Sequence, residues 1–126
     1  RHAMLIEDEP NIAEAIRFLL TRDGWQVTAL ADGGVAEQVV RQERPDLLIL
    51  DLMLPGRSGL EILMALRADP GLSGVPVMML TAKGQGRDRE AAERAGADLF
   101  MAKPFAHLGM FHGSHRATRA TPEISI

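Results

Sequence analysis

The chain contains no cysteine. This absence excludes disulfide bonds, thiolate zinc sites and cysteine nucleophiles, and it suits a reducing compartment. The sequence also has no apolar run near the roughly 18 residues that a membrane span needs, and its N-terminus lacks the zones of a signal peptide. We therefore expect a cytoplasmic protein that makes no membrane contact and whose chemistry uses oxygen and nitrogen groups.

Excess basic charge is missing as well. The 14 Lys and Arg residues are outnumbered by 17 Asp and Glu residues, which gives a formal net charge of -3. Nucleic-acid binding depends on clustered Lys and Arg, so we expect no direct nucleic-acid binding by this chain. With 126 residues, 46% of them hydrophobic, the chain has the size and composition of one globular domain. Any DNA binding would belong to another chain or domain.

Short apolar runs alternate with segments of helical periodicity. We expect strands at residues 3–6, 25–30, 47–50, 75–80 and 99–102. The alternation of strands with helices predicts a parallel sheet. The third and fourth runs are apolar almost throughout, which is typical of central strands covered by helices on both faces.

Helical periodicity is clearest in two segments. The first segment predicts a helix with one apolar face formed by Ile12, Ile16, Leu19 and Leu20. The second begins with Ser58 and Glu61, which have the spacing of a capping box. Its predicted buried face consists of Leu60, Leu63, Met64 and Leu66.

Two further helices are predicted from weaker patterns. One runs through residues 35–40 and ends before Pro45, because the proline ring disfavours helical geometry at Arg44. The other covers residues 87–95, is polar for most of its length and ends at Gly96. Its few apolar side chains predict a shallowly packed, mobile helix.

Polar side chains follow four of the predicted strands where each strand ends. These are Glu7 and Asp8, Asp51, Thr81 and Lys103. The carboxyl ends of parallel strands meet at one edge of a sheet, where open α/β sheets form their binding crevice. Three carboxylates converging with one ammonium group are unfavourable unless a cation binds or a carboxyl group is protonated. Oxygen ligands of this kind favour Mg²⁺ or Mn²⁺ over zinc or copper.

Five short motifs lie in order along the chain, at residues 6–10 (IEDEP), 50–59 (LDLMLPGRSG), 80–83 (LTAK), 95–98 (AGAD) and 103–105 (KPF). Together, and at these spacings, they resemble the receiver domain of two-component response regulators. The resemblance covers residues 3–105. It implies an α/β fold of the flavodoxin-like (CheY-like) type, with a doubly wound five-stranded parallel sheet in the order 2-1-3-4-5.

The resemblance also implies a function. A receiver domain is a phosphorylation-activated switch of a two-component phosphorelay, and Asp51 matches the residue that takes the phosphoryl group from a histidine kinase or a small phosphodonor. Asp8, Asp51 and the backbone carbonyl of Met53 match the direct Mg²⁺ ligands, and Glu7 matches an acid that acts through a metal-bound water. Such a protein catalyses its own phosphorylation and dephosphorylation and is not a turnover enzyme.

Three other residues match the family's switch. Thr81 matches the hydroxyl that turns toward the phosphoryl group, and Lys103 matches the ammonium group that pairs with it. Phe100 stands where the family carries a Tyr or Phe whose ring moves inward with the hydroxyl. Phosphorylation is then expected to change the surface around the fourth helix and the fifth strand.

The implied partners are a sensor histidine kinase or phosphotransfer protein, and a downstream protein or covalently linked output domain. Two other functions stay open. One is a phosphorylation-independent receiver-like interaction module. The other is a Mg-dependent phosphatase of the aspartyl-phosphate type, which is disfavoured because such enzymes usually carry a second acid where this chain has Met53, and also a cap region.

Residues 106–126 do not match the family's fifth helix. We therefore expect the receiver domain to cover residues 1–105 and an atypical C-terminal tail to cover residues 106–126, with at most a turn or two of helix. The tail is a degenerate short helix, a segment that docks differently or exchanges between protomers, or a sequence altered by truncation, a change of reading frame or cloning. A missing helix would leave apolar surface exposed, which favours a homodimer.

Overall fold

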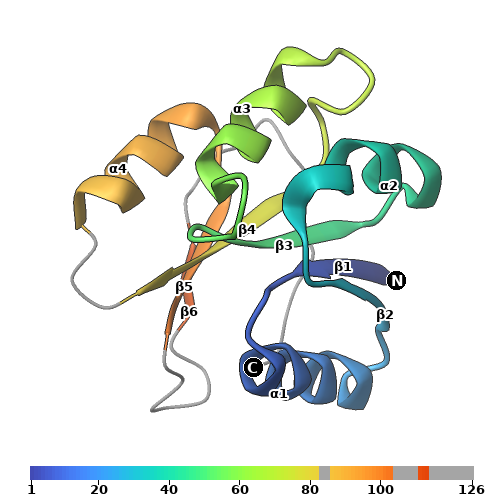
Figure 1. The fold of residues 1–126 in the computed structure, drawn as a ribbon. Helices are drawn as coiled ribbons and strands as arrows, with labels where there is room; N and C mark the ends of the chain where they lie inside the picture. Colours follow the sequence, from blue (N-terminus) through green and yellow to red (C-terminus); the bar gives the residue numbers. More distant parts are fainter. Residues whose placement is uncertain (83–85, 104–110, 114–126) are drawn as a thin grey trace.

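The computed structural model describes residues 1–82, 86–103 and 111–113, and in these residues the chain forms one six-stranded sheet (Figure 1). The strands are β1 (His2–Ile6), β2 (Gln26–Leu30), β3 (Leu47–Asp51), β4 (Val77–Ala82), β5 (Leu99–Lys103) and β6 (Phe111–Gly113). Their order across the sheet is β2-β1-β3-β4-β5-β6. Strands β1 to β5 pair in parallel, which confirms the predicted order 2-1-3-4-5.

Helices cover both faces of the sheet. They are α1 (Pro10–Arg22), the short 3-10 helix η1 (Gly33–Val35), α2 (Ala36–Glu43), α3 (Gly59–Ala68) and α4 (Gly86–Ala95). Helix α1 lies on one face, and α2, α3 and α4 lie on the other (Figure 1). Each face has its own buried cluster, because alternate residues of each central strand point to opposite sides. All five residues of β3 are buried, as expected of a central strand.

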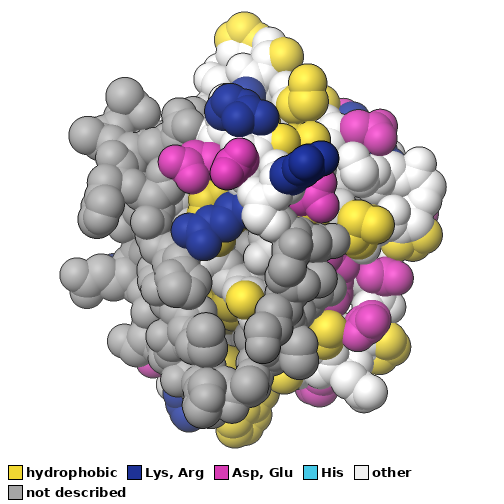
Figure 2. Space-filling model, turned by 90° about the vertical axis from the view of Figure 1, so that its left-hand side faces the viewer, with side chains coloured by type: hydrophobic (Ala, Val, Ile, Leu, Met, Phe, Trp, Pro, Cys, Tyr) yellow, Lys and Arg dark blue, Asp and Glu magenta, His cyan; other side chains and the backbone are white. Residues whose placement is uncertain are grey.

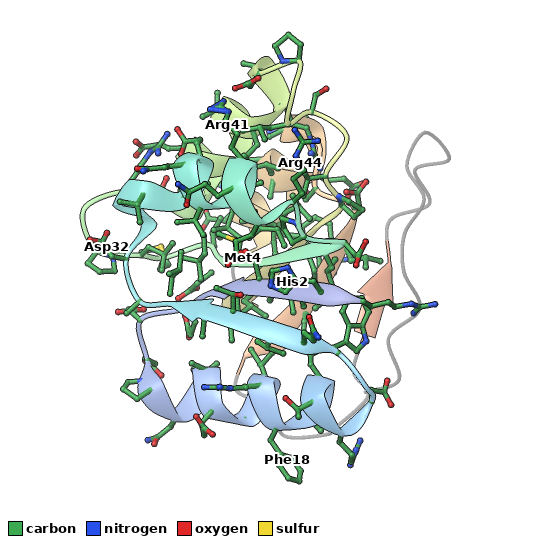
Figure 3. All side chains as sticks on the ribbon, turned by 90° about the vertical axis from the view of Figure 1, so that its right-hand side faces the viewer. His2, Met4, Phe18, Asp32, Arg41 and Arg44 are labelled. Carbon is green, nitrogen blue, oxygen red and sulfur yellow. The ribbon has the colours of Figure 1, made fainter. Side chains whose placement is uncertain are left out.

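Helix α1 forms as its sequence predicts. Pro10 occupies its first turn, where a missing backbone N–H costs nothing, and Ile16, Leu19 and Leu20 are buried. Gly24 follows the helix with a φ of 92°, a conformation that glycine adopts without steric cost. Phe18 points away from the sheet and is 65% exposed (Figure 3).

Helix α2 ends where Pro45 requires it to end. Arg44, which precedes the proline, has a left-handed backbone with φ 46° and ψ 61°. A right-handed conformation at this position would clash with the proline ring. The predicted end of the helix is therefore confirmed.

Helix α3 begins at the predicted cap, where the Ser58 side chain accepts a hydrogen bond of 3.1 Å from the backbone N–H of Glu61. Its predicted buried face is partly wrong, because Met64 is 56% exposed. The buried side chains are those of Ile62, Leu63 and Leu66. At roughly 100° per residue, Met64 lies about 140° around the helix from Gly59, which faces the sheet.

Helix α4 has little apolar contact with the rest of the fold, since Ala92 is its only buried residue. Its C-terminal end is held by the side chain of Arg67, from the last turn of α3. Arg67 donates hydrogen bonds to the carbonyl oxygens of Gly96, Ser73 and Val75 and to the buried carboxylate of Asp98. We call this set of contacts the Arg67 clasp.

The sixth strand was not predicted. β6 pairs antiparallel with β5, with Leu99 opposite Gly113 and Met101 opposite Phe111. The expectation of at most a turn or two of helix in the tail is therefore wrong for residues 111–113. Three residues with a terminal glycine give too short a pattern for the alternation of a strand to be recognised. The rest of residues 106–126 lies outside the described residues.

Candidate functional site

Strands β1 and β3 bring three carboxylates to one edge of the sheet. Ile6 and Leu50 are partners in the parallel ladder, so Glu7 and Asp51 follow at the same level. Glu7 is held there by its backbone N–H, which donates to the carbonyl oxygen of Leu30 at 2.9 Å. The predicted convergence of acidic residues at this edge is therefore present.

Glu7, Asp8 and Asp51 each offer a carboxylate oxygen, and these oxygens lie within 4.8 Å of one another. Glu7 and Asp51 are only 2% exposed, whereas Asp8 is exposed. Bringing like charges this close costs Coulomb energy that a divalent cation offsets, and clustered carboxylate oxygens are the ligands that hard cations prefer. The three residues could therefore hold a metal ion, with the open side at Asp8.

Asp51 is fixed by its own loop and by α3. One of its carboxylate oxygens accepts a hydrogen bond from the backbone N–H of Met53 at 3.2 Å. The backbone N–H of Gly59 donates to Leu52 at 2.9 Å, which places the start of α3 directly against the end of β3. A Cβ atom at Gly59 would lie 2.1 Å from the carbonyl oxygen of Asp51. Only glycine permits this approach, a requirement that spacing in the sequence does not reveal.

The loop after Asp51 is also tied to α2. Arg57 forms a two-pronged ion pair with Glu37, and one of its hydrogen bonds measures 2.9 Å. Hydrogen bonding from Arg57 lowers the pKa of Glu37, against the opposing effect of burial. The same pair raises the pKa of Arg57. Sequence analysis missed this pair because its members are 20 residues apart and belong to different elements.

Strands β4 and β5 bring the other predicted residues to this edge. Thr81 pairs with Ala102, and Lys103 is the last residue of β5, opposite Ala82. Thr81 is buried, with 7% of its surface exposed. The backbone register thus brings Lys103 to the same edge, while its side chain lies outside the described part of the structure.

Phe100 lies two pairs further back along the same two strands than the pair of Thr81 and Ala102, and it is opposite Met79. Its ring is 1% exposed, and the guanidinium group of Arg89 from α4 lies over it, 4.9 Å from the ring centroid. The contact with Arg89 was not predicted, because no periodicity links a polar helix to a particular ring.

The chain matches proteins of one family. The family model described as "Response regulator receiver domain" matches residues 3–111. The DNA-binding response regulator MtrA of Mycolicibacterium smegmatis is 42% identical over 102 residues, which are 81% of this chain and 43% of MtrA. The phosphate regulon transcriptional regulatory protein PhoB of Rhizobium meliloti is 39% identical over 121 residues, which are 95% of this chain and 53% of PhoB. The chain spans about half the length of these relatives.

Solved structures agree. The receiver domain of the sensor histidine kinase PA1611 from Pseudomonas aeruginosa, with a magnesium ion coordinated in its active site cleft, has a TM-score of 0.75 and 33% identity, and the match covers 83% of this chain and 86% of that one. The signal receiver domain of a histidine kinase from Syntrophus aciditrophicus has a TM-score of 0.74 and 32% identity, covering 82% of this chain and 78% of that one. No helix in the described residues has the length and apolar character that a membrane crossing requires. By sequence and by structure, the chain belongs to the response regulator receiver domain family.

Proposed function

We propose that Asp51 accepts a phosphoryl group in a Mg²⁺-dependent reaction and that the chain is the phosphorylation-activated switch of a larger signalling system. The observation that carries this proposal is the cluster of Glu7, Asp8 and Asp51, with their oxygens within 4.8 Å at the end of a buried strand. Asp51 is the acid at the end of the central strand β3, where its orientation is fixed by the N–H of Met53.

The metal site is assigned to the same residues. Asp8, Asp51 and the backbone carbonyl of Met53 would hold Mg²⁺, or Mn²⁺, directly, and Glu7 would act through water. A divalent cation at this place neutralises charge on the transferring group. The receiver domain of PA1611, which contains magnesium in its active site cleft, supports this assignment.

Phosphoryl transfer uses the chain's own oxygen nucleophile. A carboxylate oxygen of Asp51 forms a bond to phosphorus while the bond between phosphorus and the imidazole nitrogen of a phosphohistidine breaks. The leaving nitrogen keeps the electron pair and takes up a proton from water. Thr81 and Lys103 then bind the new phosphoryl oxygens, and later attack of water on phosphorus returns Asp51 to its carboxylate.

The donor and the output lie outside this chain. A sensor histidine kinase or phosphotransfer protein supplies the phosphoryl group in the cytoplasm, and the surface around α4 and β5 controls a downstream protein or a linked output domain. MtrA and PhoB, which are named DNA-binding and transcriptional regulators, are about twice as long as this chain, which supports a linked output domain.

Intact mass spectrometry after incubation with Mg²⁺ and acetyl phosphate tests the proposal. The wild type is expected to gain an adduct of about 80 Da that Asp51→Asn lacks. Asp69→Asn is the matched control, because Asp69 pairs with Arg41 away from the site and its loss should leave the adduct intact. Asp8→Asn should need at least about tenfold more Mg²⁺ for the same yield, since it removes a direct ligand.

The opposite results have defined meanings. An adduct that persists in Asp51→Asn contradicts the assignment of the acceptor. A folded wild-type chain that binds Mg²⁺ and gains no adduct supports the phosphorylation-independent interaction module instead. The fluorescence of Trp25, the only tryptophan and 4% exposed, reports whether each sample is folded.

A further inference from the structure

The contact between Arg89 and Phe100 joins the helix on the output side to the residue that matches the family's switch aromatic. The guanidinium carbon of Arg89 lies 4.9 Å from the centroid of the ring. This distance is within the roughly 6 Å over which a cation is attracted to the face of an aromatic ring. Among the described residues Arg89 forms no ion pair with a carboxylate, so its charge is free to interact with the ring.

Helix α4 depends on this contact more than an ordinary helix would. Ala92 is its only buried side chain, and Arg89 lies three residues before it, on the same side of the helix. The small Ala92 gives α4 little apolar area to bury, and the guanidinium group of Arg89 adds a contact of α4 with the ring of Phe100. Figure 2 shows basic and acidic side chains beside one another on the described part of the face that includes α4.

The ring is also a neighbour of the site. Met79 is opposite Phe100, and Thr81 is opposite Ala102. Residues two apart on a strand point to the same face, so Thr81 and Phe100 are diagonal neighbours on the side covered by α4. A movement of the ring therefore changes the space beside Thr81.

We propose that Arg89 holds the ring of Phe100 in its buried position and so sets the balance of the switch between a buried and an exposed ring. Phe100 is 1% exposed, and the family resemblance assigns an inward position of this ring to the activated state. Arg89 attracts the ring in the buried position and loses this contact when the ring leaves it. Loss of the contact is expected to raise the ratio of exposed to buried ring about two- to fivefold. The consequence for signalling rests on the proposed function, but the effect on the ring does not.

Fluorine NMR on protein labelled with 4-fluorophenylalanine measures this balance directly. The chain has only four phenylalanines, so the spectrum has four resonances, and the one lost in Phe100→Leu is assigned to Phe100. The fluorine resonance of the urea-denatured chain gives the frequency expected for an exposed ring. Saturation transfer at this frequency detects an exposed population of a few per cent or below. All spectra are recorded on the full chain without phosphodonor.

Arg89→Gln removes the cation and is compared with Arg87→Gln, which removes the same charge from an exposed residue on the opposite side of α4. The exposed population should rise about two- to fivefold in Arg89→Gln, stay at the wild-type level in Arg87→Gln, and be partly restored in Arg89→Lys, which keeps a cation. A merely structural role for Arg89 would lower the urea midpoint of unfolding without changing the position of the ring.

The proposal is overturned if the exposed population in Arg89→Gln equals that in Arg87→Gln, or if no exposed position is detected in Arg89→Gln. The two proposals fail separately. Absence of the mass adduct on Asp51 overturns the proposed function and leaves the ring measurement valid, because that measurement uses no phosphodonor.

Discussion

The Arg67 clasp should contribute more to stability than any other ion pair among the described residues. The guanidinium group makes five hydrogen bonds, to Gly96 twice and to Ser73, Val75 and Asp98 once each. The side chains of Arg67 and Asp98 are 11% and 0% exposed, so solvent screens this pair little. Removing one partner of a buried ion pair costs about 3–5 kcal/mol, because the other charge stays buried. We expect a loss of this size for Arg67→Met, which keeps the stem and removes the charge.

Arg41→Met provides the matched control. Arg41 and Asp69 also form an ion pair, but their side chains are 55% and 32% exposed. Exposed pairs contribute less than about 1 kcal/mol, so Arg41→Met should be nearly neutral.

Urea unfolding followed by Trp25 fluorescence measures these differences. With an ordinary slope for a domain of this size, a loss of 3–5 kcal/mol lowers the midpoint by about 2 M. This is a large part of the roughly 5–15 kcal/mol that holds a domain together. If Arg67→Met lowers the midpoint no more than Arg41→Met does, the buried clasp is not a major source of stability and the reasoning is wrong.

Two further changes test the loop that positions the site. Gly59→Ala places a methyl group 2.1 Å from the carbonyl oxygen of Asp51, so α3 must shift. We expect the free energy of unfolding in urea to fall by about 1–3 kcal/mol and the phosphoryl yield to decrease. Gly74→Ala is the control and should change neither quantity, because no atom lies within 4 Å of the added carbon. Glu37→Gln tests the ion pair with Arg57. Because the pKa of Glu37 is lowered, the pair stabilises the fold fully at pH values above the ordinary carboxyl pKa of 4.5. This contribution disappears as the pH falls through the lowered pKa. Since both side chains are partly exposed, the difference in unfolding free energy should be at most about 1 kcal/mol at pH 7 and should shrink as the pH is lowered below 4.5. A difference that does not change with pH would contradict this origin.

Much of the fold could be predicted because it depends on local patterns. The buried positions of β3, the apolar face of α1 and the end of α2 before Pro45 follow from side-chain periodicity and from proline geometry. The carboxylate cluster could also be predicted, because parallel strands deliver their carboxyl ends to one edge. The roles of the individual site residues remain predictions, and so does the boundary of the domain at residue 105.

The missed features depend on contacts between distant segments. Arg67 is an ordinary helix residue in the sequence, and its acceptors are backbone carbonyl groups that no side-chain pattern marks. Asp98 lies in the AGAD motif, yet only the structure shows that its carboxylate accepts from the N–H of Val77 at 2.9 Å and so anchors the start of β4. Met64 is a different case, since the helical angle alone would have placed it on the exposed side of α3.

The way in which α4 is attached predicts that this helix can move at low cost. An apolar helix face of ordinary size would bind α4 to the sheet through many contacts that must be lost together. Here one buried Ala92 is flanked by two arginine contacts, Arg67 on Gly96 at the C-terminal end and Arg89 on Phe100 near the N-terminal end. A guanidinium group that leaves its partner at the protein surface is rehydrated by water, so the N-terminal contact is the easier one to exchange. We therefore expect α4 to pivot about the Arg67 clasp when the ring of Phe100 moves. Hydrogen exchange in Arg89→Gln should increase at the amides of residues 90–92, which donate to the carbonyl groups of the first turn, before it increases at residues 94–96.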